Sequence, residues 1–299
     1  MDKNFQSTVL VVGATGFLGM EICRQLLQAN KKVRGLIRTS SDENIVNALT
    51  DMGVETITGD LKDPATLSEA FKNVSAVIST VSATRSRNEG DSIESVDEQG
   101  QLNAVQVAKE NGIDHFVFIS FNKVKGDFPL QTAKRKVEEA LKESGMTYTI
   151  LQPTIFMEVW LSPVLGFDFP NNKATIYGSG ENKISWISLR DVAQFAVAAL
   201  DNENAKNKSI ELGGPEALSP AEVVKLFEEE SGMTFEVQKV PEQALQQQKD
   251  GAPDSLSKSF ASLMLSYADG SEIPMNETLE KFPVKLTSVK DYARQVLTQ

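Results

Sequence analysis

Three glycines stand three residues apart near the start of the chain, at Gly13, Gly16 and Gly19. They follow the apolar run Thr8–Val12 and open the segment Phe17–Gln28, whose apolar residues recur with helical spacing. Glycines between a buried strand and a helix allow a tight turn and let the backbone approach a phosphate closely. The pattern therefore predicts a dinucleotide-binding turn rather than a ligand-free tight turn. The expected contacts are Gly13, Thr15, Gly16, Phe17, Leu18 and Gly19.

The form of the dinucleotide depends on the residue that ends the second strand. This strand is predicted over Lys32–Ile37 and is followed by Arg38, with no carboxylate before Asp42. NAD-specific sites place an acidic residue here to bind the ribose 2′-hydroxyl, whereas the planar guanidinium of an arginine binds a 2′-phosphate. We therefore expect NADP(H) in preference to NAD(H). The alternative is that Arg38 is only a solvated charge at a strand end.

Short apolar segments that alternate with helical patterns position these residues. The predicted strands are Thr8–Val12, Lys32–Ile37, Val54–Thr58, Ala76–Ser79, His115–Ser120 and Thr147–Leu151, and the helices between them include Phe17–Gln28, Asp42–Met52, Glu94–Asn111 and Leu130–Ser144. Regular alternation of this kind favours right-handed crossovers and a parallel sheet with helices on both faces. The expected fold class is α/β, a doubly wound parallel Rossmann sheet with a smaller C-terminal substrate-binding lobe.

The pattern changes after Pro153. Residues 154–186 carry prolines, paired asparagines and glycines, which are typical of a loop-rich segment beside a cleft. A helix over Asp191–Leu200 and a strand over Ser209–Leu212 are then predicted to return to the sheet. Gln243–Ser259 is expected to be the least structured part, partly helical and mobile. The predicted boundaries are 1–153 with 187–213 for the NAD(P)-binding domain, and 154–186 with 214–299 for the substrate-side lobe.

Further short motifs follow the glycines along the chain. They are Gly59-Asp60-Leu61, His115–Ser120, Lys134 with Glu138 four residues later, Tyr148–Pro153, and the segment from Ser185 to Asp191. In this order they resemble the NmrA-like branch of the atypical short-chain dehydrogenase/reductase superfamily. The resemblance covers nearly the whole chain and is best over residues 8–215.

The resemblance implies contacts with the cofactor beyond the glycine turn. It places Asp60 and Leu61 beside the adenine, and the segment after the fourth strand beside the ribose and pyrophosphate. The residues of that segment are Thr80, Val81 and Ser82. The residues expected near the nicotinamide are Pro153, Ile155 and Phe156, with Thr154 between them. The alternative for Asp60, Thr80 and Ser82 is local bonding to the backbone.

The resemblance also implies where a proton donor should stand. Typical members of the superfamily carry a serine near the end of the fifth strand and a tyrosine four residues before a lysine. Lys134 fits the lysine, but Leu130 stands at the tyrosine position, and Phe121 stands at the serine position in the favoured alignment. The catalytic candidate is therefore Lys134, acting as an acid or orienting a water or substrate oxygen once desolvation lowers its pKa. The alternative is an exposed lysine on its helix.

The composition limits the partners and the chemistry. A formal net charge of −11 disfavours nucleic acid and anionic membrane surfaces as partners. The apolar runs are strand-sized and too short to span a membrane. With one cysteine, Cys23, and one histidine, His115, no internal disulfide and no metal site are expected, and the cytoplasm is the expected location. His115 begins its strand, away from the ligand-binding edge, and is interpreted as structural.

Three functions fit these residues. The favoured one is a reductase that transfers hydride from NADPH to a small hydrophobic carbonyl, quinone or enone-like substrate. The second is a regulator that binds NADP(H) without turnover. The third is an assembly or scaffold factor with a protein partner, because the segment 128–134, with Leu130 before the lysine, resembles photosystem assembly factors of the same branch. The missing tyrosine leaves open whether the chain is an enzyme.

Overall fold

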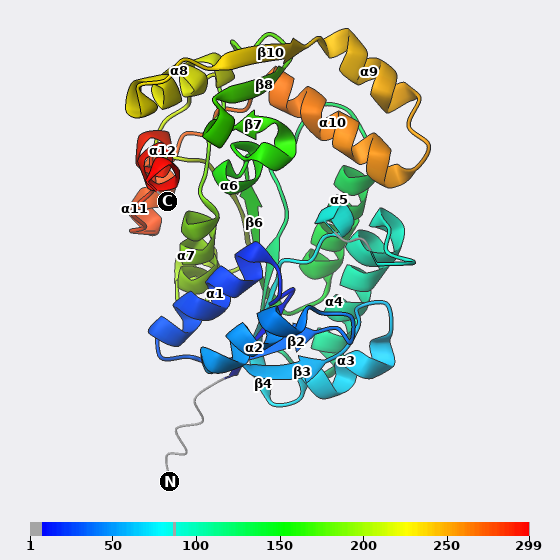
Figure 1. The fold of residues 1–299 in the computed structure, drawn as a ribbon. Coiled ribbons are helices and arrows are strands. Elements are labelled where there is room, and N and C mark those ends of the chain that lie inside the picture. The colour runs from blue at the N-terminus through cyan, green and yellow to red at the C-terminus, as the bar shows by residue number, and fades with distance from the viewer. Residues whose placement is uncertain (1–7, 86–87, 299) are drawn as a thin grey trace. The chain divides into compact units, whose positions relative to one another are not determined.

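The computed structural model describes residues 8–85 and 88–298. Its main element is a seven-stranded sheet with the strand order β3-β2-β1-β4-β5-β6-β9 (Figure 1). The strands are β1 (Thr8–Val12), β2 (Lys32–Ile37), β3 (Glu55–Thr58), β4 (Val74–Ser79), β5 (His115–Ile119), β6 (Thr147–Pro153) and β9 (Lys208–Leu212). All pairings from β3 through β6 are parallel. The predicted doubly wound parallel sheet is confirmed.

The strand order reverses between β1 and β4, and this reversal determines where a ligand can bind. Strands β2 and β3 extend the sheet on one side of β1, and β4 to β6 extend it on the other. Right-handed crossovers then place the helices of the two halves on opposite faces. These helices are α1 (Phe17–Gln28), α2 (Glu43–Asp51), α3 (Pro64–Phe71), α4 (Gln101–Glu110) and α5 (Pro129–Glu143). A crevice opens at such a reversal, at the carboxyl ends of the strands.

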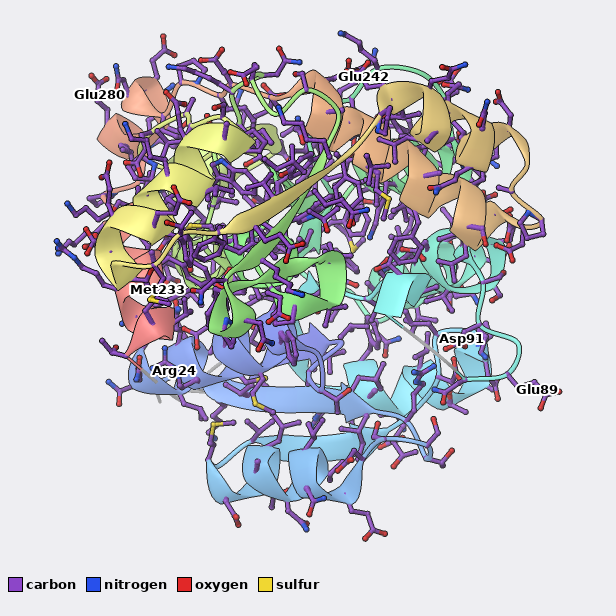
Figure 2. All side chains as sticks on the ribbon, turned by 45° about the horizontal axis from the view of Figure 1, so that its top comes forward. Arg24, Glu89, Asp91, Met233, Glu242 and Glu280 are labelled. Atoms are coloured by element: carbon purple, nitrogen blue, oxygen red, sulfur yellow. The ribbon has the colours of Figure 1, made fainter. Side chains whose placement is uncertain are left out.

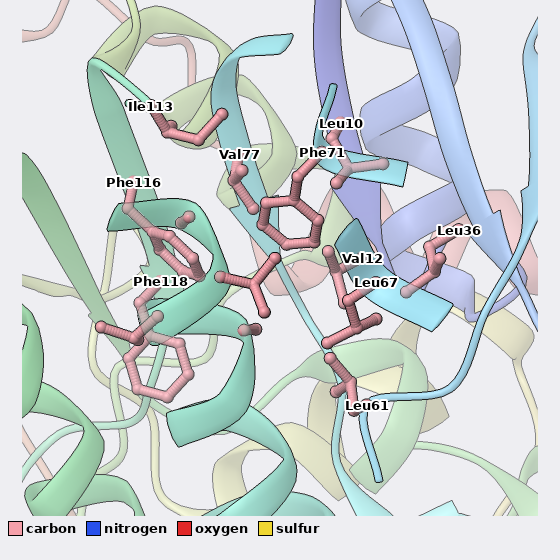
Figure 3. Close-up of a cluster of buried hydrophobic side chains, with 14 of the residues drawn as sticks. Leu10, Val12, Leu36, Leu61, Leu67, Phe71, Val77, Ile113, Phe116 and Phe118 are labelled. Carbon is pink, nitrogen blue, oxygen red and sulfur yellow. The ribbon is translucent and has the colours of Figure 1, made fainter. Parts of the chain in front are cut away.

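The alternation of side chains along the strands supplies the core on both faces of the sheet. On one face, Leu10 and Val12 of β1 pack in a cluster with Phe71 of α3 and Phe116 of β5 (Figure 3). Helices α4 and α5 add Ala104, Ala108, Val137 and Leu141 to this cluster. On the other face, α1 fully buries Ile22 and Leu26. Burial of each large apolar side chain stabilises the fold by about 1.5–3 kcal/mol.

The helix predicted over Glu94–Asn111 begins with a wider turn than expected. Residues Ile93–Gly100 form a π-helix, η2, that continues directly into α4. Ser92 caps it by accepting from the backbone N–H of Ser95. The wider turn coincides with two inward polar side chains, Asp97 and Gln101, which are fully buried. Both side chains bind the end of β4 and the residues that follow it, so the irregular turn belongs to the candidate site.

The chain divides into two compact units. The first comprises the described residues up to Ser120, with Pro129–Leu151 and Ala193–Ile210, and carries most of the sheet and of α7 (Leu189–Ala199). The second comprises Phe121–Phe128, Gln152–Val192 and the residues from Glu211 onward. Its elements are α6 (Met157–Trp160), β7 (Phe167–Asp168), β8 (Lys173–Tyr177), α8 (Pro220–Ser231), β10 (Glu236–Val240), α9 (Glu242–Asp250), α10 (Ser255–Asp269), α11 (Asn276–Lys281) and α12 (Val289–Leu297). Short single turns are η1 (Ala83–Arg85), η3 (Pro163–Leu165), η4 (Phe169–Asn171) and η5 (Glu203–Ala205).

The second unit corrects one expectation. The segment Gln243–Ser259, expected to be the least structured part, lies in helices α9 and α10, which run side by side (Figure 1). Leu245 is fully buried, and Asp254 caps α10 by accepting from the N–H of Ser257 at 2.6 Å. The inward face of α10 includes small polar side chains such as Ser259 and Ser262. A helix whose buried face is partly polar has little apolar periodicity, which is why the sequence predicted only partial helix in this segment.

Candidate functional site

The glycine-rich turn has the backbone geometry that a bound phosphate requires. Gly13 has a φ of +92°, and the N–H of Gly16 donates to its carbonyl at 3.0 Å. A Cβ on Gly19 would lie 2.0 Å from the carbonyl oxygen of Gly13, whereas a Cβ on Gly16 would lie 3.3 Å from it. Gly19 is thus needed for packing, while a methyl group on Gly16 would require the Gly13 carbonyl to shift only by a few tenths of an ångström. No side chain caps α1, and the neighbouring Phe17 is 60% exposed.

The end of β4 lies directly against this turn. The N–H of Thr80 donates to the carbonyl of Val12 at 2.9 Å, and Thr80 Oγ1 would be 2.6 Å from a Cβ on Gly13. The carbonyl of Val81 accepts from Gln101 Nε2 at 3.0 Å. Thr80 and Val81 therefore lie beside the glycines, where the sequence predicted them. Their contacts with a cofactor stay a prediction.

Lys134 is buried rather than exposed on its helix. Its side chain is 5% exposed, and Nζ lies 3.3 Å from the carbonyl oxygen of Val81 and 3.4 Å from that of Ile119. Asp97 Oδ1 is 3.6 Å from Nζ, and the Phe118 ring centroid is 4.8 Å away. The three N–H groups of the ammonium thus face three acceptors, one of them a fully buried carboxylate.

Asp97 was not identified from the sequence. Its Oδ2 accepts from the backbone N–H of Ala83 at 2.8 Å, so it links Lys134 to the segment after β4. Burial raises the pKa of Asp97, and the neighbouring Lys134 opposes this shift. Burial likewise lowers the pKa of Lys134, and Asp97 opposes that shift. The signal in the sequence was the pair Asp97 and Gln101, two polar residues four apart on an otherwise apolar helix face.

The residues at the usual serine and tyrosine positions supply no donor. Leu130 is buried and apolar. Ser120, at the end of β5, donates its hydroxyl to Glu138 Oε1 at 2.5 Å. Phe121 stacks on Phe128 with ring centroids 6.1 Å apart, and both belong to the second unit. Lys134 is a buried, protonatable side chain of the first unit that lies beside the segment after β4.

A charged cluster stands at the ends of β2 and β3. Arg38 Nη1 binds Asp91 Oδ2 at 2.6 Å, and Lys62 Nζ binds Asp91 Oδ1 at 2.7 Å. Asp60 accepts from the N–H of Lys62 at 2.9 Å, and its Oδ2 is 4.0 Å from Lys62 Nζ. Leu61 is buried and its carbonyl accepts from Asn103. Arg38 is therefore held in an ion pair, not merely solvated, and Lys62 is a cation that the sequence reading did not single out.

The residues predicted near the nicotinamide lie in the second unit. Thr154 donates its N–H to the carbonyl of Leu212 at 2.9 Å and its hydroxyl to the carbonyl of Ser185. Phe156 forms a bridge with Ile187. Pro153 ends β6, and Ile155 is half-buried beside the apolar cluster of this unit. Their contact with a nicotinamide stays a prediction.

The described residues contain no group of three or more His, Cys, Asp or Glu side chains that could hold a metal ion. Among them there is also no helix long and apolar enough to cross a membrane.

The single histidine and the single cysteine are both buried. A hydrogen bond of 2.8 Å joins His115 Nε2 and Thr149 Oγ1, and the Thr149 hydroxyl donates to the carbonyl of Ala205. Since the Thr149 proton is used, His115 Nε2 carries the proton and donates it. Cys23 is fully buried, which raises the pKa of its thiol to about 12.

Comparisons with known proteins match nearly the whole chain. The model described as NmrA-like family matches residues 5–293. An NAD(P)H azoreductase of Xenophilus azovorans is 32% identical, covering 85% of this chain and 85% of that protein. A photosystem II assembly factor Ycf39 of a Synechocystis strain is 33% identical, covering 78% of this chain and 70% of that protein. The solved leucoanthocyanidin reductase–NADPH complex from Vitis vinifera is 20% identical, with a TM-score of 0.79 over 98% of this chain and 100% of that chain.

Proposed function

Because the chain belongs to the NmrA-like family, as its motifs predicted, we propose that it is an NADPH-dependent reductase of a small hydrophobic carbonyl, quinone or enone-like substrate. The observation that carries the proposal is the placement of Lys134. Its ammonium is buried against the carbonyl of Val81, two residues after the strand that borders the glycine-rich turn. A proton source and a dinucleotide turn thus meet at the same edge of the sheet.

The residues present fit a dinucleotide phosphate. Gly16 leaves the backbone bare at the start of α1 and, as the N-cap residue, supplies no side-chain cap. Backbone N–H groups and the positive dipole end at the start of a helix bind phosphate. Arg38, which follows β2, supplies the guanidinium that favours NADP(H) over NAD(H). Reduced nicotinamide, when bound, supplies a hydride.

Lys134 would hold and deliver the proton. Hydride addition to an electrophilic carbon leaves negative charge on the substrate oxygen, and that oxygen takes a proton from Nζ or from a water that Nζ orients. Nζ makes two long hydrogen bonds, to the carbonyls of Val81 and Ile119, and lies 3.6 Å from Asp97 Oδ1, so these contacts leave it able to donate to the substrate oxygen. Asp97 would hold the ammonium in place and favour its charged form before transfer.

The test is turnover of NADPH against quinones, aldehydes, azo dyes and enones. Lys134→Met keeps the length of the side chain and removes its proton, so we expect kcat to fall on the order of a hundredfold or more. Lys136→Met is the matched control, since Lys136 lies on the same helix but is 53% exposed and paired with Glu98. Equal kinetics of the two variants would reject the role of Lys134.

One observation favours a second candidate function. The chain is about as similar to a photosystem II assembly factor as to an azoreductase, and Leu130 replaces the usual tyrosine. An assembly or scaffold role, or NADP(H) binding without turnover, would use the same fold with a protein partner. A partner that is retained by a Gly16→Ala variant, together with no NADPH oxidation across the substrates above, would favour this candidate over the reductase.

A further inference from the structure

The carboxylate of Asp91 is held between two cationic side chains, as a bound anionic ligand would be. One oxygen receives Arg38 Nη1 at 2.6 Å and the other receives Lys62 Nζ at 2.7 Å. The side chain is 2% exposed, whereas those of Arg38 and Lys62 are 35% and 29% exposed. Two cations that a ligand can reach thus converge on one anionic group. We call Arg38 and Lys62 the cation pair.

The three side chains come from segments that are distant in the sequence. Arg38 directly follows β2, and Lys62 lies four residues after the end of β3, which is next to β2 in the sheet. Asp91 lies in the segment between β4 and η2, although β1 separates β4 from β2 in the sheet. All three belong to the first unit. The carboxylate therefore bridges the crevice region at the strand reversal, where a dinucleotide would bind.

The backbone on either side of Asp91 is fixed. The N–H of Asp91 donates to the carbonyl of Asn88 at 3.2 Å, and the next residue, Ser92, caps η2. The neighbouring Glu89 is exposed and projects outward from this segment (Figure 2). In this segment the buried carboxylate is thus aimed at the cation pair and the exposed one is not.

The local charge is balanced without a ligand. Arg38 and Lys62 carry two positive charges, and Asp91 together with Asp60, 4.0 Å from Lys62, carries two negative ones. A phosphomonoester brings close to two further negative charges at neutral pH. It repels the carboxylate that already occupies the cation pair and is attracted to the same two cations. A phosphate there therefore weakens the contacts of Asp91.

We propose that the cation pair is the 2′-phosphate site and that Asp91 occupies it as an internal competitor when no cofactor is bound. The proposal rests on the proposed binding of NADP(H) and adds Lys62 and Asp91 to it. Binding of a 2′-phosphate releases the Asp91 carboxylate. The larger the fraction of molecules in which Asp91 occupies the cation pair, the lower the apparent affinity for NADP(H). Selection for the 2′-phosphate thus comes from Lys62 as well as Arg38.

The experiment measures equilibrium dissociation constants of NADPH and NADH, and of adenosine 2′,5′-bisphosphate and adenosine 5′-monophosphate. Asp91→Asn removes the competing charge with little change in size, so NADPH and the bisphosphate should bind about tenfold more tightly. Lys62→Gln removes one donor and should weaken both about tenfold. NADH and the monophosphate should change less than twofold in either variant, because they lack the contested phosphate.

Matched controls separate local from general charge effects. Glu89→Gln removes one negative charge from the same segment, and Lys72→Gln removes a lysine from an exposed pair with Glu69. Neither control should alter the ratio of NADPH to NADH affinity. Thermal unfolding checks that each variant is folded, and Asp91→Ser repeats the removal of the carboxylate with a different residue.

The proposal is overturned if Asp91→Asn and Asp91→Ser weaken NADPH, because the carboxylate would then position the cations and not compete. It is also overturned if Lys62→Gln affects NADPH and NADH equally. Failure of the proposed function is a different result, in which NADPH is not oxidised or neither dinucleotide binds. The two adenosine phosphates still test the cation pair in that case.

Discussion

At the scale of single residues, the candidate site depends on charges that are buried in pairs. Removing one partner of a buried pair leaves an uncompensated charge, which is strongly destabilising. Lys134 and Asp97 are 5% and 0% exposed, and each shifts the pKa of the other against the effect of burial. The pair therefore controls both the position of the ammonium and how readily it gives up its proton.

The first prediction concerns the proton of Lys134. Asp97 stabilises the charged ammonium, so Asp97→Asn should lower the pKa of Lys134 further. If Lys134 is the proton donor, turnover falls as pH rises through this pKa. In the variant the fall should begin at a lower pH. The measurement is the pH profile of kcat in the wild type and the variant.

A merely structural role for Asp97 gives a different result. The variant would then lose stability and activity at every pH, and its profile would keep the shape of the wild-type profile. Asp291→Asn is a suitable control, because Asp291 lies in the second unit, in the first turn of α12, where its carboxylate accepts from the hydroxyl of the cap residue Ser288. Its profile should match that of the wild type.

The sequence located Lys134 but not the residues that act on it. Lys134 was found because it stands at a known position before Glu138, and Arg38 because it ends a predicted strand. Asp97 and Asp91 pair with cations that are distant in the sequence. The order of the strands in the sheet determines which acidic residue lies beside which cation. A net charge of −11 provides many acidic candidates, so sequence alone could not select these two.

At the scale of elements, the glycine turn shows how one pattern serves two purposes. Gly19 allows α1 to pack against the turn, since a Cβ there would meet backbone at 2.0 Å. A Cβ on Gly16 would lie 3.3 Å from the carbonyl oxygen of Gly13, a tight but less severe contact, and the pyrophosphate is expected at this glycine. The element boundaries in the first half were predicted within two residues because apolar periodicity is strong there. The π-helix and α10 were not predicted, since their inward faces carry polar side chains.

The second prediction separates the two glycines. Gly16→Ala should change the free energy of unfolding by no more than about 1 kcal/mol and weaken NADPH about tenfold or more, because its Cβ points toward the phosphates. Gly19→Ala should destabilise the chain by about 2 kcal/mol or more, because backbone atoms cannot yield. Denaturant unfolding and NADPH titration measure both effects. A Gly16→Ala variant that binds NADPH like the wild type would contradict the assignment of the turn.

At the scale of the whole molecule, the two units divide the chemistry. The first carries the glycine turn, the cation pair and Lys134, and the second carries Pro153 to Phe156 and an aromatic cluster. In that cluster Trp160 stacks on Tyr267 with ring centroids 5.1 Å apart, and Tyr177 meets Tyr267 edge-on at 5.6 Å. The motifs that identify the family lie mostly in the first unit, and the proposal places the substrate beside residues of the second.

The third prediction concerns the stability of the whole chain toward acid. Burial lowers the pKa of His115 to about 4 from 6.5. Between these values the unfolded chain binds a proton that the folded chain does not, so stability is lost as pH falls from about 6.5 to about 4. The loss from this group is at most about 3 kcal/mol. His115→Gln keeps a donor for Thr149 but does not titrate, so its unfolding free energy should fall less over this range. Parallel pH dependence of the two proteins would contradict the assignment.

The most direct test of the account is the oxidation of NADPH by the purified chain in the presence of the quinone, aldehyde, azo and enone substrates, with Lys134→Met and Lys136→Met measured beside it. The account predicts turnover by the wild type and Lys136→Met, and a loss on the order of a hundredfold in Lys134→Met. Tight binding of NADPH without its oxidation by any of these substrates would contradict the reductase.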